Sequence, residues 1–198
     1  MDIDPSKPVP GENLQEKNGV IIAIDVDNLM IAAAKAGQKS QGYDMEFGFK
    51  KMIDWVRTFG NILCMHLYMP ATQSMSDILW HKLWETYREE FLIEFIYCPK
   101  KRSESGGKRL DNVDDHLIDH TRKIANLFSG KVKYFCLASG DLDYSSLLWQ
   151  LRREMNMEIA FALGSVISFS RAYRQMNITA RHPLTGEELI YYFSPHKP

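Results

Sequence analysis

Acidic residues gather at three places in the sequence where carboxylates could do chemistry together. One apolar run leads into "IDVDN", with Asp25, and a later one into "SGDLDY", with Asp141 and Asp143; "NVDDH" adds Asp114 and Asp115. Converging carboxylates repel each other unless a cation lies among them. Oxygen ligands of this kind suit Mg²⁺ or Mn²⁺, which can activate a water and neutralise charge on a phosphate. These residues therefore suggest a divalent-cation site for phosphate chemistry.

Each acidic motif also has a purely structural interpretation. Asp25 can cap a following helix, "SGDLDY" can form a polar turn, and Asp114 suits the first turn of a helix. His116 and His120 have metal-ligand spacing, yet a histidine pair beside lysine and arginine is more often a solvated helix face. The sequence has no cysteines and histidines at zinc-site spacing, which favours a hard cation over zinc. Capping explains each motif separately, but it does not explain why three of them occur together.

An alternation of strands and helices predicts how these motifs are positioned. Repeated strand–helix units fold into a three-layer α/β/α, Rossmann-like domain with a mainly parallel central sheet. Ligands bind beyond the carboxyl ends of such strands, near the switch in strand order, where the first and fourth strands are commonly neighbours. The three acidic motifs should therefore meet at one edge. The predicted strands are 20–24, 62–68, 91–98, 133–138 and 157–163, and the helices are 47–59, 76–90, 113–128 and 144–154.

Length and composition bound the class of protein. The 198 residues suffice for one domain, which we place at 20–198 with a C-terminal extension after about residue 164, preceded by a flexible arm at 1–19. The net charge of -1 neither favours nor excludes nucleic acid, so any attraction must come from local patches. No apolar run approaches the ~18 residues of a membrane span, and the N-terminus is no signal peptide. We expect a cytoplasmic protein with no membrane partner, and the late aromatic run "LIYYF" suggests either a homodimer surface or a docked tail.

A basic stretch, "PKKRSESGGKR", directly precedes the central acidic motif. Charge runs are most often simply solvated. Beside a metal site, however, flexible cations are what an RNA phosphodiester backbone requires. The candidate RNA-binding residues are Lys100, Lys101, Arg102, Lys108 and Arg109.

Taken together, the motifs resemble those of the NYN domain family, a branch of the PIN-like nucleases. "IDVDN" is similar to the family's I-D-x-x-N, "KRLDNVDDHL" to its acidic pair opening a helix after a lysine, and "SGDLDY" to its S-G/N/T-D-x-D/N-F/Y. The three motifs occur in the family's order, and the resemblance covers about Val20 to Leu163. One departure is Val26, where many members have glycine.

The resemblance implies a PIN-like fold and a Mg²⁺- or Mn²⁺-dependent endoribonuclease acting on single-stranded or structured RNA. In that activity an ion-activated water attacks phosphorus and leaves a 5′-phosphate. The implied roles are catalysis by Asp25, Asp115 and Asp141, metal binding by these three with Asp114 and Asp143, and support from Asn28 and Ser139.

Two other function classes remain open. A non-catalytic RNA-binding or regulatory module can use the same fold. A metal-dependent phosphatase with a D-x-D-x-T/V motif is a weaker match, because the fourth residue after Asp25 is Leu29.

Overall fold

A computed structural model describes residues 18–29, 31, 45–71, 77–99, 112–161 and 173. Within these ranges the strand–helix alternation predicted from the sequence is confirmed. Residues 1–17 of the predicted arm, residues 100–109 of the basic stretch, the extension after residue 164 apart from Tyr173, and the "LIYYF" run lie outside the described residues, and Gly19 already belongs to β1. The elements are β1 (Gly19–Asp25), α2 (Met45–Val56), β2 (Asn61–Pro70), α3 (Asp77–Tyr87), β3 (Leu92–Cys98), α4 (Val113–Leu127), β4 (Val132–Ala138), the 3₁₀ turn η1 (Leu142–Tyr144), α5 (Ser145–Glu154) and β5 (Glu158–Phe161).

The central sheet has five parallel strands in the order β3-β2-β1-β4-β5. β1 lies between β2 and β4, which confirms that the first and fourth strands are neighbours. Asp25 is in register with Tyr68, and Ile24 with Ala138, so the carboxyl ends of these three strands reach the same edge. β2 and β3 lie on one side of β1, and β4 and β5 lie on its other side, so the strand order switches between β1 and β4, which is where ligands bind in such sheets.

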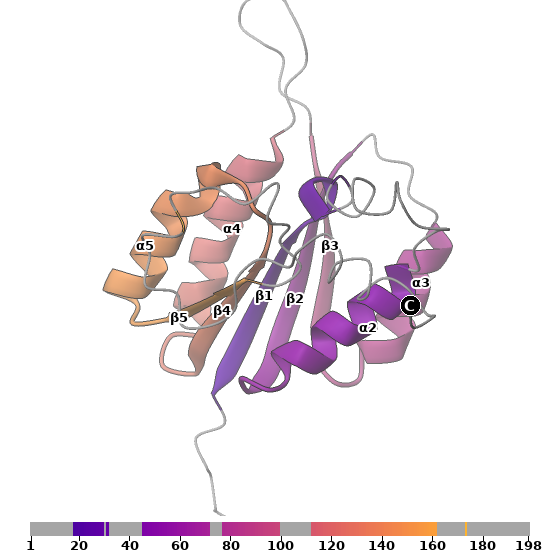
Figure 1. Cartoon of the computed structure of the whole chain (residues 1–198), viewed down its shortest axis with the longest axis horizontal. Helices are drawn as coiled ribbons and strands as arrows, with labels where there is room; N and C mark the ends of the chain where they lie inside the picture. Colours follow the sequence, from indigo (N-terminus) through magenta and orange to yellow (C-terminus); the bar gives the residue numbers. More distant parts are fainter. Residues whose placement is uncertain are drawn as a thin grey trace, which may run out of the picture.

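Helices cover both faces of the sheet. α2 and α3 lie on one face, and α4 and α5 lie on the other (Figure 1). The predicted apolar stripe of α2, with Phe49, Met52, Ile53 and Val56, is fully buried against the first face. On the second face Leu117 of α4 packs with residues of α5 and the sheet. These layers confirm the α/β/α prediction. No helix in the described part of the chain is long and apolar enough to cross a membrane.

Candidate active site

The carboxyl end of β1 begins the site. β1 ends at Asp25, and residues 26–29 are helical, so the chain turns immediately. The backbone N–H of Asn28 donates to Asp25 Oδ1 at 3.1 Å, which confirms a capping role for this carboxylate. The side-chain oxygen of Asn28 in turn accepts the N–H of Gly140 at 3.1 Å. Asn28 therefore joins the ends of two strands that are far apart in sequence.

The loop after β4 completes this junction. Ser139 Oγ donates to Asp25 Oδ2 at 3.2 Å and accepts the backbone N–H of Asp141, also at 3.2 Å. Asp141 Oδ1 accepts the N–H of Asp143 at 3.3 Å, so Asp141 is the N-cap of η1. The "SGDLDY" motif is thus a turn and also the support of the buried Asp25 carboxylate.

Tyr144 connects the two acidic motifs that flank this loop. Its phenolic oxygen lies 2.9 Å from Asp25 Oδ2 and 2.6 Å from Asp114 Oδ1, the latter in the first turn of α4. A phenol has a single proton to donate. It can therefore donate to one carboxylate only, and the other contact is favourable when that second carboxyl carries a proton and donates it. Without a cation, the cluster of Asp25, Asp114 and Tyr144 is built to retain a proton.

Burial dominates the electrostatics of this acidic cluster. The Asp25 side chain is only 5% exposed, and burial raises its pKa to about 6, although the Asn28, Tyr144 and Ser139 hydrogen bonds act in the opposite direction. Burial also raises the pKa of Asp114, and the nearby charge of Asp141 adds to that effect. In the described part of the chain, no lysine or arginine forms an ion pair with Asp25 or Asp114. The cluster is therefore a strong candidate for binding a cation.

The structure separates the neighbouring acids of "NVDDH". Asp114 is half-buried and contacts Tyr144, whereas Asp115 is exposed. Asp141 is half-buried and Asp143 is exposed, and both act on Asp114 through their charge. Among the described residues, no three of these five carboxylates bring oxygen atoms within 4.8 Å of one another. The structure thus brings Asp25 and Asp114 together on Tyr144, whereas Asp141 caps η1 and Asp115 and Asp143 are exposed. The five basic candidates, residues 100–102, 108 and 109, lie outside the described residues.

Sequence reasoning assigned no role to two tyrosines at this site. Tyr144 is fully buried, and the sequence feature that could have indicated its role is its position as the aromatic residue that ends "SGDLDY". Tyr173 comes from beyond the sheet and donates its hydroxyl to the backbone carbonyl of Asp141. Nothing in the sequence around Tyr173 indicates this contact, because it joins two residues that are 32 positions apart in the chain.

The parallel sheet, with carboxylates at the switch point, is an α/β fold of the PIN-like class. A family model described as the NYN domain matches residues 19–176, and the chain belongs to this family. The family is generally nuclease-like. A crystal structure of a protein of unknown function from Vibrio parahaemolyticus is similar in fold, with a TM-score of 0.58 and 17% identity over 85% of this chain and 95% of that one. The comparison with curated proteins finds no match.

Proposed function

We propose that the chain is a Mg²⁺- or Mn²⁺-dependent endoribonuclease that cleaves RNA at the acidic cluster. Membership of a nuclease-like family supports the class of reaction. The observation that carries the proposal is the convergence of Asp25, from β1, and Asp114, from α4, on the one phenol of Tyr144. A buried carboxylate, Asp25, beside a half-buried one, Asp114, costs stability when both are charged, and such arrangements cluster at functional sites.

The donor set fits a hard cation. Asp25 and Asp114 would hold it with carboxylate oxygens, and Ser139 and Tyr144 add only hydroxyl oxygens to the surroundings. When bound, such an ion supplies a lowered pKa for an attacking water and charge neutralisation for the phosphate.

The chain's own residues would orient these groups. Tyr144 fixes the separation of Asp25 and Asp114, and Ser139 and Asn28 hold the strand ends in place. Asp141 and Asp143 add negative potential at Asp114, which raises the local concentration of divalent cations. The basic stretch at 100–109 would contact the RNA backbone, in line with its sequence composition.

A matched pair of variants tests the proposal. Asp114→Asn and its neighbour Asp115→Asn make the same chemical change one residue apart, at a half-buried and an exposed position. With labelled single-stranded and structured RNA and Mn²⁺, we expect Asp114→Asn to cleave about 100-fold more slowly or worse, and Asp115→Asn to lose far less. Equal rates in wild type and Asp114→Asn would refute the assignment of this site.

One observation favours a second candidate, a non-catalytic RNA-binding module. Only two of the five predicted carboxylates converge closely, and no set of three does so among the described residues. RNA binding by the wild-type chain without cleavage, in either Mg²⁺ or Mn²⁺, would support this candidate over the nuclease.

A further inference from the structure

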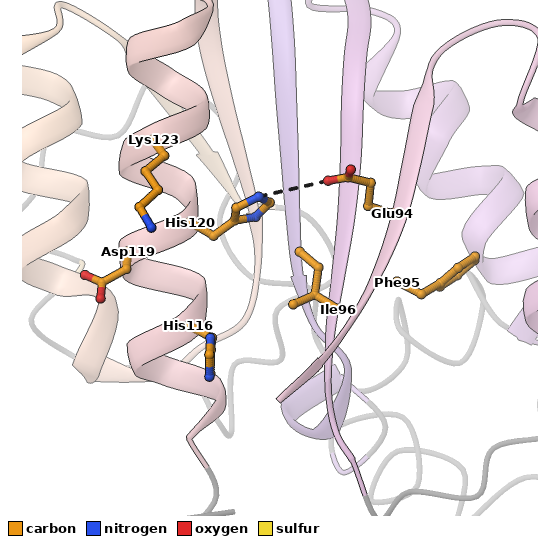
Figure 2. Close-up of a pocket in the computed structure, with 7 residues that line it drawn as sticks. All are labelled: Glu94, Phe95, Ile96, His116, Asp119, His120 and Lys123. Atoms are coloured by element: carbon orange, nitrogen blue, oxygen red, sulfur yellow. Dashed lines mark ion pairs between the residues drawn. The ribbon is translucent and has the colours of Figure 1, made fainter. Parts of the chain in front are cut away.

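Three potential metal ligands meet on the α4 side of the sheet, apart from the acidic cluster. They are His66 on β2, Glu94 on β3 and His120 on α4, and their ligand atoms all lie within 4.8 Å of one another. Nε2 of His66 is 3.1 Å from Glu94 Oε2, and Nε2 of His120 is 4.0 Å from the same oxygen. Figure 2 shows Glu94 and His120 facing each other from the sheet and the helix. We call these three residues the histidine cluster.

His66 is the residue that protein contacts do not explain. Its side chain is 1% exposed, yet neither ring nitrogen has a hydrogen-bond partner within the described structure. The 3.1 Å approach of Nε2 to Glu94 lacks the geometry of a hydrogen bond. Buried polar side-chain atoms in proteins are nearly always hydrogen-bonded, so a buried imidazole without a partner favours a bound ion at this position. Burial lowers the pKa of His66 to about 4, and the imidazole is therefore neutral at pH 7.

His120 is oriented as metal-binding histidines usually are. Its Nδ1 lies 2.9 Å from the hydroxyl oxygen of Tyr68, which leaves Nε2 directed at Glu94. A hydrogen bond on the second ring nitrogen fixes the tautomer and the ring orientation of a metal ligand. The rings of His66 and His120 are 4.9 Å apart, so one ion can reach both.

An open cavity gives access to the cluster. It has a volume of about 620 Å³, and Glu94 and His120 line it. His116 and Asp119 also line the cavity from α4 (Figure 2). The cavity offers an entry path and room for a water as a further ligand, both of which a workable metal site requires.

We propose that His66, Glu94 and His120 bind one Zn²⁺ ion, at a site distinct from the acidic cluster. Two imidazole nitrogens and one carboxylate oxygen form a donor set that suits Zn²⁺, whereas Mg²⁺ prefers oxygen ligands alone. The bound ion joins two strands and a helix and stabilises their packing. The sequence did not indicate it, because His66 and His120 come from different elements, and only the pair His116 and His120 had a recognisable spacing.

The test is a Zn²⁺ titration of the chelator-treated full chain against a competing chromophoric chelator. Wild type should bind one Zn²⁺ tightly, and His120→Ala should bind it at least ~100-fold more weakly, since even outer-shell changes cost 10–100-fold. His81→Ala is the matched control: His81 Nε2 lies 3.4 Å from Glu85 Oε1 on α3, the described residues offer no third ligand there, and this variant should retain wild-type affinity.

Two further variants make the outcome decisive. Asp25→Asn should keep the tight Zn²⁺ site, whereas Tyr68→Phe, which removes the hydrogen bond to His120, should weaken it about tenfold. Glu94→Gln, at a 43% exposed side chain, replaces His120→Ala if that variant does not fold. The proposal is overturned if wild type binds no Zn²⁺ tightly, if the tight site survives the ligand variant (His120→Ala, or Glu94→Gln in its place), or if it disappears in Asp25→Asn.

Discussion

The acidic cluster and the histidine cluster lie on the same face of the sheet but are built on different principles. Asp25 lies at the carboxyl end of β1, which is where ligand-binding residues usually occur in parallel α/β sheets. His66 stands in the middle of β2, in register with Ala23 and Glu94, where topology gives no expectation of a site. The acidic cluster can therefore be predicted from the order of motifs along the chain. The histidine cluster forms only when two strands and a helix pack together, so the sequence alone does not predict it.

Burial has opposite consequences for charge at the two clusters. It raises the pKa of Asp25 to about 6, which favours the protonated carboxyl, and lowers the pKa of His66 to about 4, which favours the neutral imidazole. A cation must compete with a proton at the acidic cluster. At the histidine cluster the buried imidazole is already in its metal-binding form. The two sites should therefore differ in metal preference and also in the pH dependence of metal binding.

The largest expected effect separates the two clusters functionally. Asp25→Asn should reduce RNA cleavage by about 100-fold or more, because it removes a carboxylate from the proposed cation site. The same variant should leave Zn²⁺ affinity at the histidine cluster within about twofold of wild type, since Asp25 contributes no ligand there. Gel-based cleavage and Zn²⁺ competition on one protein preparation check both. Parallel losses would mean that the clusters form a single site.

The second prediction concerns the free energy of unfolding and the direction in which it changes with pH. The pKa of Asp25 is higher in the folded chain than its ordinary 3.8, so the folded state binds this proton more tightly than the unfolded state does. The contribution of Asp25 to the free energy of unfolding is therefore full below about pH 4 and falls as pH rises to about 6. Asp25→Asn should raise the metal-free unfolding free energy at pH 7 by ~1–3 kcal/mol.

Chemical denaturation with chelator present, at pH 4 and pH 7, measures this difference. Asp115→Asn is the control: its carboxylate is exposed in the first turn of α4, and its loss should lower the unfolding free energy by ~0.3–1 kcal/mol at pH 7. If Asp25→Asn proves less stable than wild type at pH 7, the buried charge of Asp25 does not destabilise the metal-free fold and the prediction is wrong.

A smaller effect is expected from Tyr144→Phe. The change removes the hydroxyl between Asp25 and Asp114 and should destabilise the chain by ~0.5–1.5 kcal/mol. It should also raise the pKa of Asp25 further, because the Tyr144 hydrogen bond lowers it. A two-dimensional NMR titration of the Asp25 carboxyl reports the shift, and Tyr68→Phe, which lies at the histidine cluster, should leave that pKa unchanged.

The smallest effect concerns RNA affinity. Lys108→Gln with Arg109→Gln should weaken RNA binding across sequences and reduce the slope of log K against log salt by about 1 to 2. Lys131→Gln with Lys133→Gln removes the same charge near the amino end of β4, at the opposite end of the strand from the acidic cluster. Filter binding over a range of salt compares the two, and equal slopes would exclude a specific basic track.

Periodicity and apolar runs suffice to predict the fold of this chain. The apolar stripe of α2 and the uncharged run of β1 each predict which side chains are buried. A layered α/β/α arrangement is what buries both of them. The element ends were less accurate, as β2 extends to Pro70 beyond the predicted Tyr68. Hydrogen bonds at element ends depend on neighbours that periodicity does not describe.

The candidate site was only partly predictable, for physical reasons. Strand-end motifs pointed to Asp25 and Ser139, whose side chains are hydrogen-bonded at 3.2 Å, because the positions of both follow from topology. The choice between Asp114 and Asp115 depends on helix register, since one residue turns a side chain by about 100°. Tyr173 and His66 depend on tertiary contacts between segments far apart in sequence, which a single sequence does not reveal.

Helix α4 has a consequence that neither cluster shows alone. It carries Asp114 in its first turn and His120 six residues later, about 9 Å along the same axis. If each cluster holds an ion, a shift of α4 that improves metal coordination at one cluster also changes the ligand geometry at the other cluster. Thermodynamic reciprocity then requires that each ion change the other's affinity by the same factor. Through α4, the concentration of one metal would thus determine how tightly the other cluster binds its own metal.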